Sequence, residues 1–483
     1  MILKRSLLAC TLSCITLTVS AHSDFGVHNV DTQFHVPEIG GGVGLIDQQK
    51  ERQIGEKVFR EIQKQMPVIH DPWLQEQYSQ IFLRILTQTS ITQPVGLVII
   101  KDPQINAFAV PGGLFALNTG LIANARNTDE VAGVMAHEIA HVTQRHYSRS
   151  QEAFKGQGLL ALAGIIVGAA VATTSNADVG SAVMLGTQAA LMDQQLTYSR
   201  NQEREADRIG MQYMYAAGYN PQSMADFFET MQRSRVGSSF MPDFWMTHPL
   251  TTERMSEARL RANQLPKIET KLYDPNFQLL KWYTLAISDQ SAETRLENLV
   301  KQGNTEAQLA LAAYYVKQGD SVKAQMQLDD IKSQFNENTL YSLIQTDIYL
   351  GQNKLELAYS SIINIQRAIP ESRALAYKLA EVMILQGKAG NTLQLVQPFV
   401  NRNPRDLEGW QLMQQASSID RLSPVQAVNT LRYRAEVQFW SGNEENAIKS
   451  LLHAQRLAKG NESLAARIDS RLKQMQSDYT MKI

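Results

Sequence analysis

The feature that most restricts how this chain can fold is the segment from His137 to His141, which reads His-Glu-Ile-Ala-His. A helix is predicted from Thr128 to Arg145, because Asn127 can cap its first turn. Positions four residues apart share one face of a helix, so the two histidines project side by side and can bind one metal ion. Glu138 lies one position round the helix, where it can take a proton from a water molecule that attacks a carbonyl. The segment therefore predicts a zinc site with an adjacent general base.

The alternative is an ordinary helix whose histidines are only surface or core residues. The helix is mostly apolar, with Val134, Ile139, Ala140 and Val142 around the histidines. Two buried histidines and a glutamate would be costly there without a partner. The composition of the helix therefore favours the metal site.

A catalytic zinc site needs a third protein ligand, and a second helix supplies the candidates. This helix contains Glu203 and Asp207 and is expected to end at Gly218. Glu203 and Asp207 are four residues apart, so one can bind zinc while the other hydrogen-bonds a ligand histidine. Glu205 is a rival for the ligand position, but no aspartate follows it at the same spacing.

The beginning of the chain has the pattern of a secretory signal peptide. Residues 1–21 carry Lys4 and Arg5, then an apolar run to about Val19, and small residues ending at Ala21. Such a segment is cleaved on export and is too short for a membrane span. We therefore expect the remainder of the chain to be exported.

Cysteine content and charge narrow the class further. Both cysteines, Cys10 and Cys14, lie in the expected signal peptide. A lipid anchor at Cys10 is disfavoured because few apolar residues precede it. The mature chain would have neither disulfides nor a catalytic thiol, which fits a bacterial periplasm. The formal net charge of −1 gives no electrostatic reason to expect a nucleic-acid partner.

We divide the 483 residues into four parts. After the signal peptide come an N-terminal extended segment (22–44), a zinc metallopeptidase domain (45–268) and a helical domain (269–483). The expected fold class is mainly α: a zincin-like α+β peptidase domain with a small sheet, followed by an all-α tetratricopeptide-repeat solenoid. We expect the peptidase domain to fold without the helical domain, since its helices have their own caps and apolar faces.

The peptidase domain should begin with two amphipathic helices and a small sheet. The helices are predicted from Leu45 to Gln65 and from Pro72 to Gln88, and the strands at Val95–Ile100, Ala107–Val110 and Leu114–Leu117. An open edge of this sheet could pair with an extended peptide beside the metal. A plain structural hairpin explains the pattern equally well.

The most apolar stretch of the mature chain runs from Gly156 to Thr174. It is short and broken by glycines, whereas a membrane span needs roughly 20 apolar residues. One interpretation is a buried or partly mobile helical hairpin. The other is a segment that makes peripheral contact with a membrane or a client protein.

The last part of the chain has a repeating pattern of helices. Gly319, Gly351 and Gly387 each end a predicted helix, and Pro370 and Pro404 recur at a similar interval of about 34 residues. This period is typical of tetratricopeptide repeats, which form a solenoid with a concave surface for extended partners. A generic helical bundle is the alternative.

Three motifs together resemble a known family. They are the His-Glu-x-x-His segment, the Ser-Arg-x-x-Glu-x-x-Ala-Asp segment that ends at Asp207, and His248-Pro249 with Arg254. The segment Asn106–Gly113 also matches the pattern of this family. The chain is similar here to the metallopeptidases that include HtpX and the CAAX-prenyl endopeptidases, over roughly Leu45 to Leu265. Unlike those enzymes, it does not show multiple transmembrane segments.

The resemblance assigns roles to individual residues. It implies that His137, His141 and Glu203 bind one zinc ion per chain, and that Glu138 is the catalytic base. It also implies that Asp207 is the carboxylate that supports a ligand histidine.

The combination of an exported peptidase with tetratricopeptide repeats resembles members of this family that act on outer-membrane proteins. The resemblance implies a periplasmic protease with chaperone-like activity, which promotes β-barrel assembly and degrades stalled or misfolded barrels. The implied partners are outer-membrane β-barrel proteins, such as the lipopolysaccharide-transport barrel LptD, and the barrel-assembly machinery. The alternative function is a client-binding chaperone or scaffold with a latent metal site.

His248 has three possible roles. It stands in a loop near the end of the peptidase domain, and histidine can fill the open position of a catalytic zinc site. In the first hypothesis it binds zinc in a resting state and leaves when a client arrives. In the second, His248 and Arg254 stabilise the oxyanion formed during attack. In the third, His248 only caps its loop.

Overall fold

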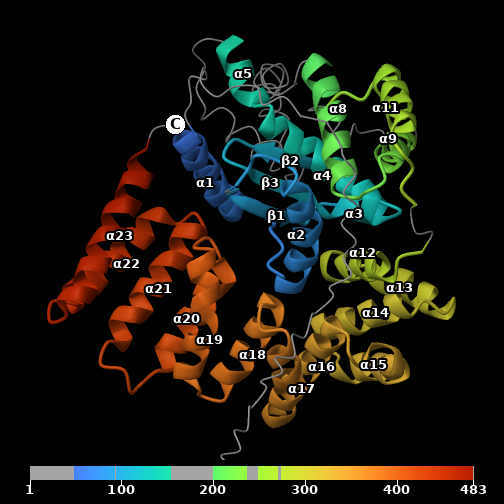
Figure 1. Cartoon of the computed structure of the whole chain (residues 1–483). Helices are drawn as coiled ribbons and strands as arrows, with labels where there is room; N and C mark the ends of the chain where they lie inside the picture. The colour runs from blue at the N-terminus through green and yellow to red at the C-terminus, as the bar shows by residue number, and fades with distance from the viewer. Residues whose placement is uncertain (1–47, 93, 154–199, 236–247, 270–272, 482–483) are drawn as a thin grey trace, which may run out of the picture. The chain divides into compact units, whose positions relative to one another are not determined.

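The structure is a computed structural model that describes residues 48–92, 94–153, 200–235, 248–269 and 273–481 (Figure 1). Three predicted segments lie outside the described residues: the signal peptide, the extended segment 22–44 and the apolar stretch Gly156–Thr174. None of the described helices combines the length and the apolar character that a membrane span requires.

The first part of the chain is α+β, as predicted. Its helices and strands are α1 (Gln48–Gln65), α2 (Pro72–Leu86), β1 (Gly96–Ile100), β2 (Ala107–Val110), β3 (Leu114–Asn118), α3 (Thr119–Asn124), α4 (Thr128–Thr143), α5 (His146–Ala153), α8 (Arg200–Ala216), α9 (Gln222–Arg235) and α11 (Thr252–Gln264). Each predicted strand is present to within one residue at either end.

The three strands form one small sheet in the order β1-β3-β2. β1 runs parallel to β3, with Gly96 opposite Leu114, and β2 runs antiparallel to β3. Gly112 and Gly113, with φ of 84° and 73°, make the reversal between β2 and β3 possible, because L side chains rarely adopt this conformation. β3 is the central strand and is buried throughout, which leaves β2 at one edge of the sheet.

α4 is the central helix of this part, packed against α2, α8, α9 and β2 (Figure 1). Its start is fixed as predicted: the backbone N–H of Glu130 donates to Asn127 Oδ1 at 2.9 Å. The Glu130 carboxylate in turn accepts from the Arg126 backbone N–H at 2.6 Å. The residues of α4 from Glu130 to His141 are all buried. The helix that carries the predicted zinc motif is therefore held on every side.

The second part of the chain is all-α, as predicted. Its helices are α12 (Pro275–Ser288), α13 (Ala292–Lys301), α14 (Thr305–Lys317), α15 (Ser321–Phe335), α16 (Thr339–Gly351), α17 (Leu355–Ala368), α18 (Arg373–Leu385), α19 (Ala389–Arg402), α20 (Leu407–Ile419), α21 (Gln426–Trp440), α22 (Glu444–Leu457) and α23 (Glu462–Thr480). Each helix packs against the next one along the chain (Figure 1).

The predicted helix ends in this part are mostly those observed. Gly319 and Gly387 follow their helices in the left-handed region, with φ of 79° and 73°. Gly351 is instead the last residue of α16. The residue in the left-handed region after this helix is Asn353, with φ of 56°. The assignment of these helices to tetratricopeptide repeats stays a prediction.

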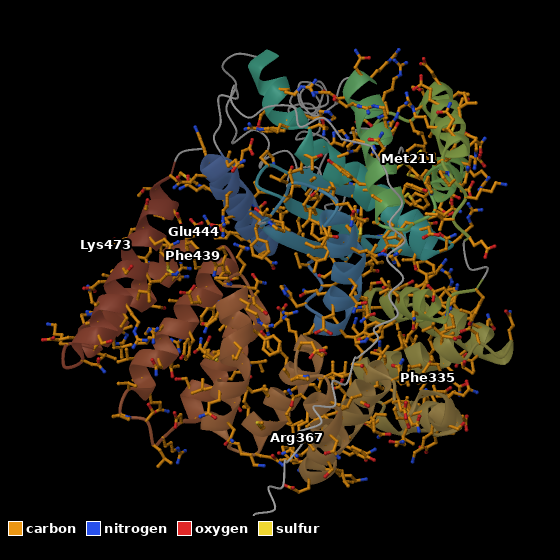
Figure 2. The ribbon with its side chains drawn as sticks, in the orientation of Figure 1. Met211, Phe335, Arg367, Phe439, Glu444 and Lys473 are labelled. Carbon is orange, nitrogen blue, oxygen red and sulfur yellow. The ribbon has the colours of Figure 1, made fainter. Side chains whose placement is uncertain are left out.

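The hydrophobic core crosses the boundary that we predicted between residues 268 and 269. Val58 and Phe59 of α1 belong to the same cluster of buried side chains as Phe439 and Trp440 of α21. Phe439 and Glu444, labelled in Figure 2, lie on helices next to α1, and the Arg60 Nε of α1 donates to the Glu444 carboxylate. The boundary stays a prediction. The shared core, however, argues against our expectation that the peptidase part folds without the helices.

A polar junction joins α2 to the N-terminus of α18. The Glu76 carboxylate of α2 accepts the backbone N–H of Ala374 at 2.9 Å and the hydroxyl of Ser372 at 3.1 Å. A carboxylate at a helix N-terminus stabilises that helix. Beside it, His70 Nδ1 lies 2.6 Å from Glu408 Oε1. These contacts add to the shared core in holding the two parts together.

Candidate active site

His137 and His141 lie on one face of α4, with their Nε2 atoms 3.0 Å apart. Both side chains are buried. The helical spacing of four residues produces this pairing. The predicted pair is therefore present as a buried, convergent pair of ring nitrogens.

α8 brings two carboxylates to the histidines. Glu203 Oε1 lies 3.4 Å from His141 Nε2, and Glu203 Oε2 lies 3.6 Å from His137 Nε2. Asp207, one turn further along α8, places Oδ1 2.9 Å from His137 Nδ1. Glu203 therefore faces the ring nitrogens that converge, and Asp207 faces the opposite nitrogen of His137.

His248 joins this cluster from the segment before α11. Its Nδ1 lies 3.3 Å from His137 Nε2 and 3.0 Å from Glu203 Oε1. Its Nε2 lies 3.5 Å from Glu138 Oε1. The side chain is buried, so the hypothesis that His248 only caps its loop does not account for its position.

His137, His141, Glu203 and His248 could hold a metal ion. Each offers one ligand atom, and the four atoms lie within 4.8 Å of one another. Zinc binds imidazole nitrogens and carboxylate oxygens at about 2.0–2.1 Å in a tetrahedron, which separates neighbouring ligand atoms by roughly 3.3 Å. The distances given above between nitrogen and oxygen atoms of these side chains run from 3.0 to 3.6 Å, on either side of that value. The donor set and its spacing therefore fit a tetrahedral zinc ion.

Arg254 fixes both carboxylates of α8. Its Nε and Nη2 donate to Asp207 Oδ2 and Oδ1, each at 2.8 Å, and its Nη1 lies 2.7 Å from Glu203 Oε2. Burial would raise the pKa of Asp207 and Glu203, but the neighbouring Arg254 and histidines outweigh burial and lower both. Both carboxylates are thus kept ionised.

Further contacts of Arg254 bear on the role that the oxyanion hypothesis gives to it. Arg254 is buried, and besides the two carboxylates its Nη1 donates to the backbone oxygen of Pro249 at 2.9 Å. Its guanidinium is therefore committed to the protein. Arg254 orders the acidic side of the site through four of its five N–H groups.

Glu138 lies beside the cluster, as predicted from its place on the helix. Burial raises its pKa above the ordinary value of a glutamate, although the nearby His248 and His137 oppose the effect. The backbone N–H of Ala109 in β2 also opposes this rise in the pKa of Glu138. A raised pKa makes a glutamate a better proton acceptor.

Glu203 and Glu205 of α8 were both candidates for the third ligand position, and they lie in different surroundings in the structure. Glu205 points away from the cluster and pairs with His146, whose Nε2 lies 3.1 Å from Glu205 Oε2. It is therefore not among the four residues that offer ligand atoms. His146 itself was missed in our sequence analysis, although it follows the motif by only five positions.

A buried cluster that could hold a metal ion, with a carboxylate beside it, is the arrangement found in metallopeptidases. Residues 70–262 match the model of a family described as Peptidase family M48. The chain is 29% identical to the β-barrel assembly-enhancing protease of Escherichia coli (strain K12) over 488 residues, which cover 98% of this chain and 96% of that protein. It is 30% identical to the enzyme of the same name from Yersinia pestis over 452 residues, 91% of each chain. The chain therefore belongs to peptidase family M48.

Proposed function

We propose that this protein is a periplasmic zinc endopeptidase that promotes the assembly of outer-membrane β-barrel proteins and degrades barrels that stall or misfold. The name of the relatives supports the role in barrel assembly. One observation carries the catalytic part: four ligand atoms lie within 4.8 Å of one another, with Glu138 beside them.

In this proposal His137, His141 and Glu203 hold the zinc ion. When bound, the ion supplies a Lewis acid that polarises a peptide carbonyl and makes a water molecule more acidic. Asp207 accepts the proton at His137 Nδ1, which leaves Nε2 as the lone-pair donor toward the metal. Arg254 keeps Asp207 and Glu203 in position.

Glu138 is the general base and then the general acid. Its raised pKa lets its carboxylate take a proton from the attacking water and return it to the leaving amine. Burial excludes bulk water from this exchange. Replacing Glu138 by glutamine would keep the shape of the side chain and remove this proton transfer.

The edge strand β2 is the proposed binding site for the substrate backbone. β2 packs beside α4, and the backbone N–H of its Ala109 favours the ionised form of Glu138. An extended peptide that pairs with an edge strand gains backbone hydrogen bonds without restricting its sequence. A stalled β-barrel exposes unpaired strands of this kind. The position of β2 next to the base favours a substrate-binding role over a plain hairpin.

His248 is proposed to keep the site closed at rest. Its Nδ1 lies among the ligand atoms, and its Nε2 lies next to Glu138. A substrate carbonyl and the attacking water need this same space. We therefore propose that His248 completes the metal site in a resting state and withdraws when a client binds.

The helical part of the chain is proposed to bind clients and machinery. As tetratricopeptide repeats, these helices would present a concave surface to outer-membrane barrels such as LptD and to the barrel-assembly machinery. The closed position of His248 also supports a second function, a chaperone or scaffold whose protease is mostly latent. The two functions are compatible in one chain.

Replacing Glu138 by glutamine in cells separates the two functions, because the metal ligands remain. If the protease is required, the Glu138→Gln strain will accumulate stalled barrels, whereas a chaperone role will survive the change. Unchanged turnover of a stalled barrel would contradict the proteolytic function.

A further inference from the structure

The second ring nitrogen of each helix-borne histidine has a different partner. His137 Nδ1 faces the carboxylate of Asp207 directly. His141 Nδ1 instead lies 2.9 Å from the Nδ1 of another imidazole, His146. His146 is completely buried, and its ring stands at 78° to that of His141. The support of His141 therefore depends on a residue that the zinc motif does not include.

The chain of contacts continues from His146 to the surface. His146 Nε2 lies 3.1 Å from Glu205 Oε2, and the same oxygen accepts from Arg149 Nη1 at 3.0 Å. If His141 binds metal through Nε2, its proton must be on Nδ1 and is donated to His146 Nδ1. His146 must then carry its own proton on Nε2 and donate it to Glu205. The carboxylate at the end of the chain thus fixes one tautomer at both histidines.

The backbone around His146 is shaped to hold it there. Arg145, between α4 and α5, adopts a left-handed conformation with φ of 51°, which is uncommon for a residue with a side chain. Its guanidinium is fixed by Glu51 of α1 at 2.8 Å, and Gln202 of α8 donates to the backbone oxygen of His146 at 3.1 Å. Strain of this kind persists only where the surroundings impose it. The turn brings the His146 ring back against His141.

We propose that His146 and Glu205 form a relay that positions His141 and sets how tightly the site holds its metal. This inference rests on the proposed zinc site and adds two residues to it. His146 accepts the His141 Nδ1 proton and so keeps Nε2 free as a ligand, while Glu205 keeps His146 in the accepting tautomer. Partners of ligand histidines at this distance typically contribute 10–100-fold to metal affinity.

The test measures the zinc dissociation constant of full-length protein by competition with a chromophoric chelator. Glu138→Gln is the parent, so that no variant digests itself. His146→Leu removes the acceptor and keeps an apolar volume. His146→Asn places an amide oxygen near the position of Nδ1 and can still accept the proton. Glu205→Leu removes the far end of the relay, and His453→Leu, an exposed histidine on α22, is the control.

We expect His146→Leu to weaken zinc binding 10–100-fold and Glu205→Leu to weaken it about tenfold. His146→Asn should restore affinity to within about threefold of the parent, and His453→Leu should leave it unchanged. The thermal midpoint of each metal-free variant shows whether a loss of zinc affinity comes from a misplaced His141 or from a less stable fold. If His146→Leu does not fold, the comparison of Glu205→Leu with the parent decides.

Two results would overturn the relay. One is an unchanged zinc affinity in both His146→Leu and Glu205→Leu. The other is a failure of His146→Asn to rescue zinc affinity, together with a lower thermal midpoint of the metal-free protein in every variant that loses affinity. That result would mean that His146 contributes only packing. A parent that binds no zinc would instead overturn the zinc site itself, and the relay with it.

Discussion

Gly210 of α8 lies against the backbone of Ala136 of α4, so close that a Cβ on Gly210 would be 2.9 Å from the Ala136 carbonyl carbon and oxygen. Contacts this short to backbone atoms cannot be relieved by a side-chain movement. Ala136 immediately precedes His137, and Gly210 follows Asp207 by one turn. The missing side chain of one glycine therefore sets the separation between the histidines and the carboxylates.

Replacing Gly210 by alanine should push α8 away from α4 and loosen the metal site. We expect zinc affinity to fall at least tenfold, because displacement of Glu203 and Asp207 affects one ligand and the support of another, His137. The free energy of unfolding of the metal-free protein should fall by about 1–3 kcal/mol, as in other overpacked cores. Chelator competition and urea unfolding measure the two effects. Gly390→Ala is the control, since a Cβ there meets no atom within 4 Å. Wild-type zinc affinity in Gly210→Ala would show that the close approach is not needed.

Two of the hypotheses for His248 predict opposite effects when its side chain is removed. If His248 closes the resting site, His248→Ala should cleave casein and a stalled barrel faster than wild type, with zinc retained by the other three ligands. If His248 stabilises an oxyanion, the same variant should lose roughly 100-fold or more in rate. Measured rates on both substrates, each divided by zinc content, decide between them. A large loss of activity with zinc retained would contradict the closed-site hypothesis.

Acid should weaken the junction between α2 and the helical part. Burial would raise the pKa of Glu408, but its hydrogen bond with His70 and the charge of Arg373 outweigh burial and lower it to about 2. A carboxylate with a lowered pKa in the folded state stabilises the fold above its ordinary pKa, and this stabilisation is lost as the pH falls toward 2. Glu408→Gln should therefore reduce the free energy of unfolding by about 1–3 kcal/mol at pH 7 and by clearly less at pH 3.

Chemical unfolding of Glu408→Gln at both pH values, beside the exposed control Glu371→Gln, provides the measurement. The same loss for Glu408→Gln at pH 7 and pH 3 would show that the charge of Glu408 contributes nothing to the junction.

Removal of the helical part should destabilise the peptidase part. Deletion of residues from Asn276 onward exposes Val58 and Phe59 of α1, which pack in one cluster with Phe439 and Trp440. We expect the truncated chain to aggregate or to bind a hydrophobic dye. In the full chain, Phe439→Ala should lower the free energy of unfolding by about 3–5 kcal/mol. Thermal unfolding monitored through the peptidase part tests this, and a truncated chain that unfolds as cooperatively as the intact protein would refute a shared core.

The sequence predicted most of the site because helical spacing determines it. His137 and His141 had to share a face of α4, and Glu203 and Asp207 had to share a face of α8. The strands and the all-α second part could be predicted equally well, because the spacing of apolar residues and the glycines that end helices depend on local conformation. The close approach of the α4 and α8 backbones was not predictable, because Gly210 gives no local signal that another backbone passes against it.

Three further features depend on tertiary contacts that sequence patterns do not record. His146 reaches His141 only through the left-handed turn at Arg145, and a positive φ at arginine has no sequence signature. The engagement of Arg254 with the α8 carboxylates depends on how α11 packs on α8. The shared core arises because the last helices return to α1, and each apolar face alone is consistent with a separate domain.

The central claim is that His137, His141 and Glu203 hold a catalytic zinc ion for which Glu138 is the base. The most direct measurement is zinc content together with the rate of casein cleavage for purified Glu138→Gln, compared with wild type and Glu203→Ala. The account predicts about one zinc per chain in Glu138→Gln with cleavage abolished, and loss of both zinc and cleavage in Glu203→Ala, because two ligands hold zinc poorly. Full zinc content in Glu203→Ala, or wild-type cleavage by Glu138→Gln, would contradict it.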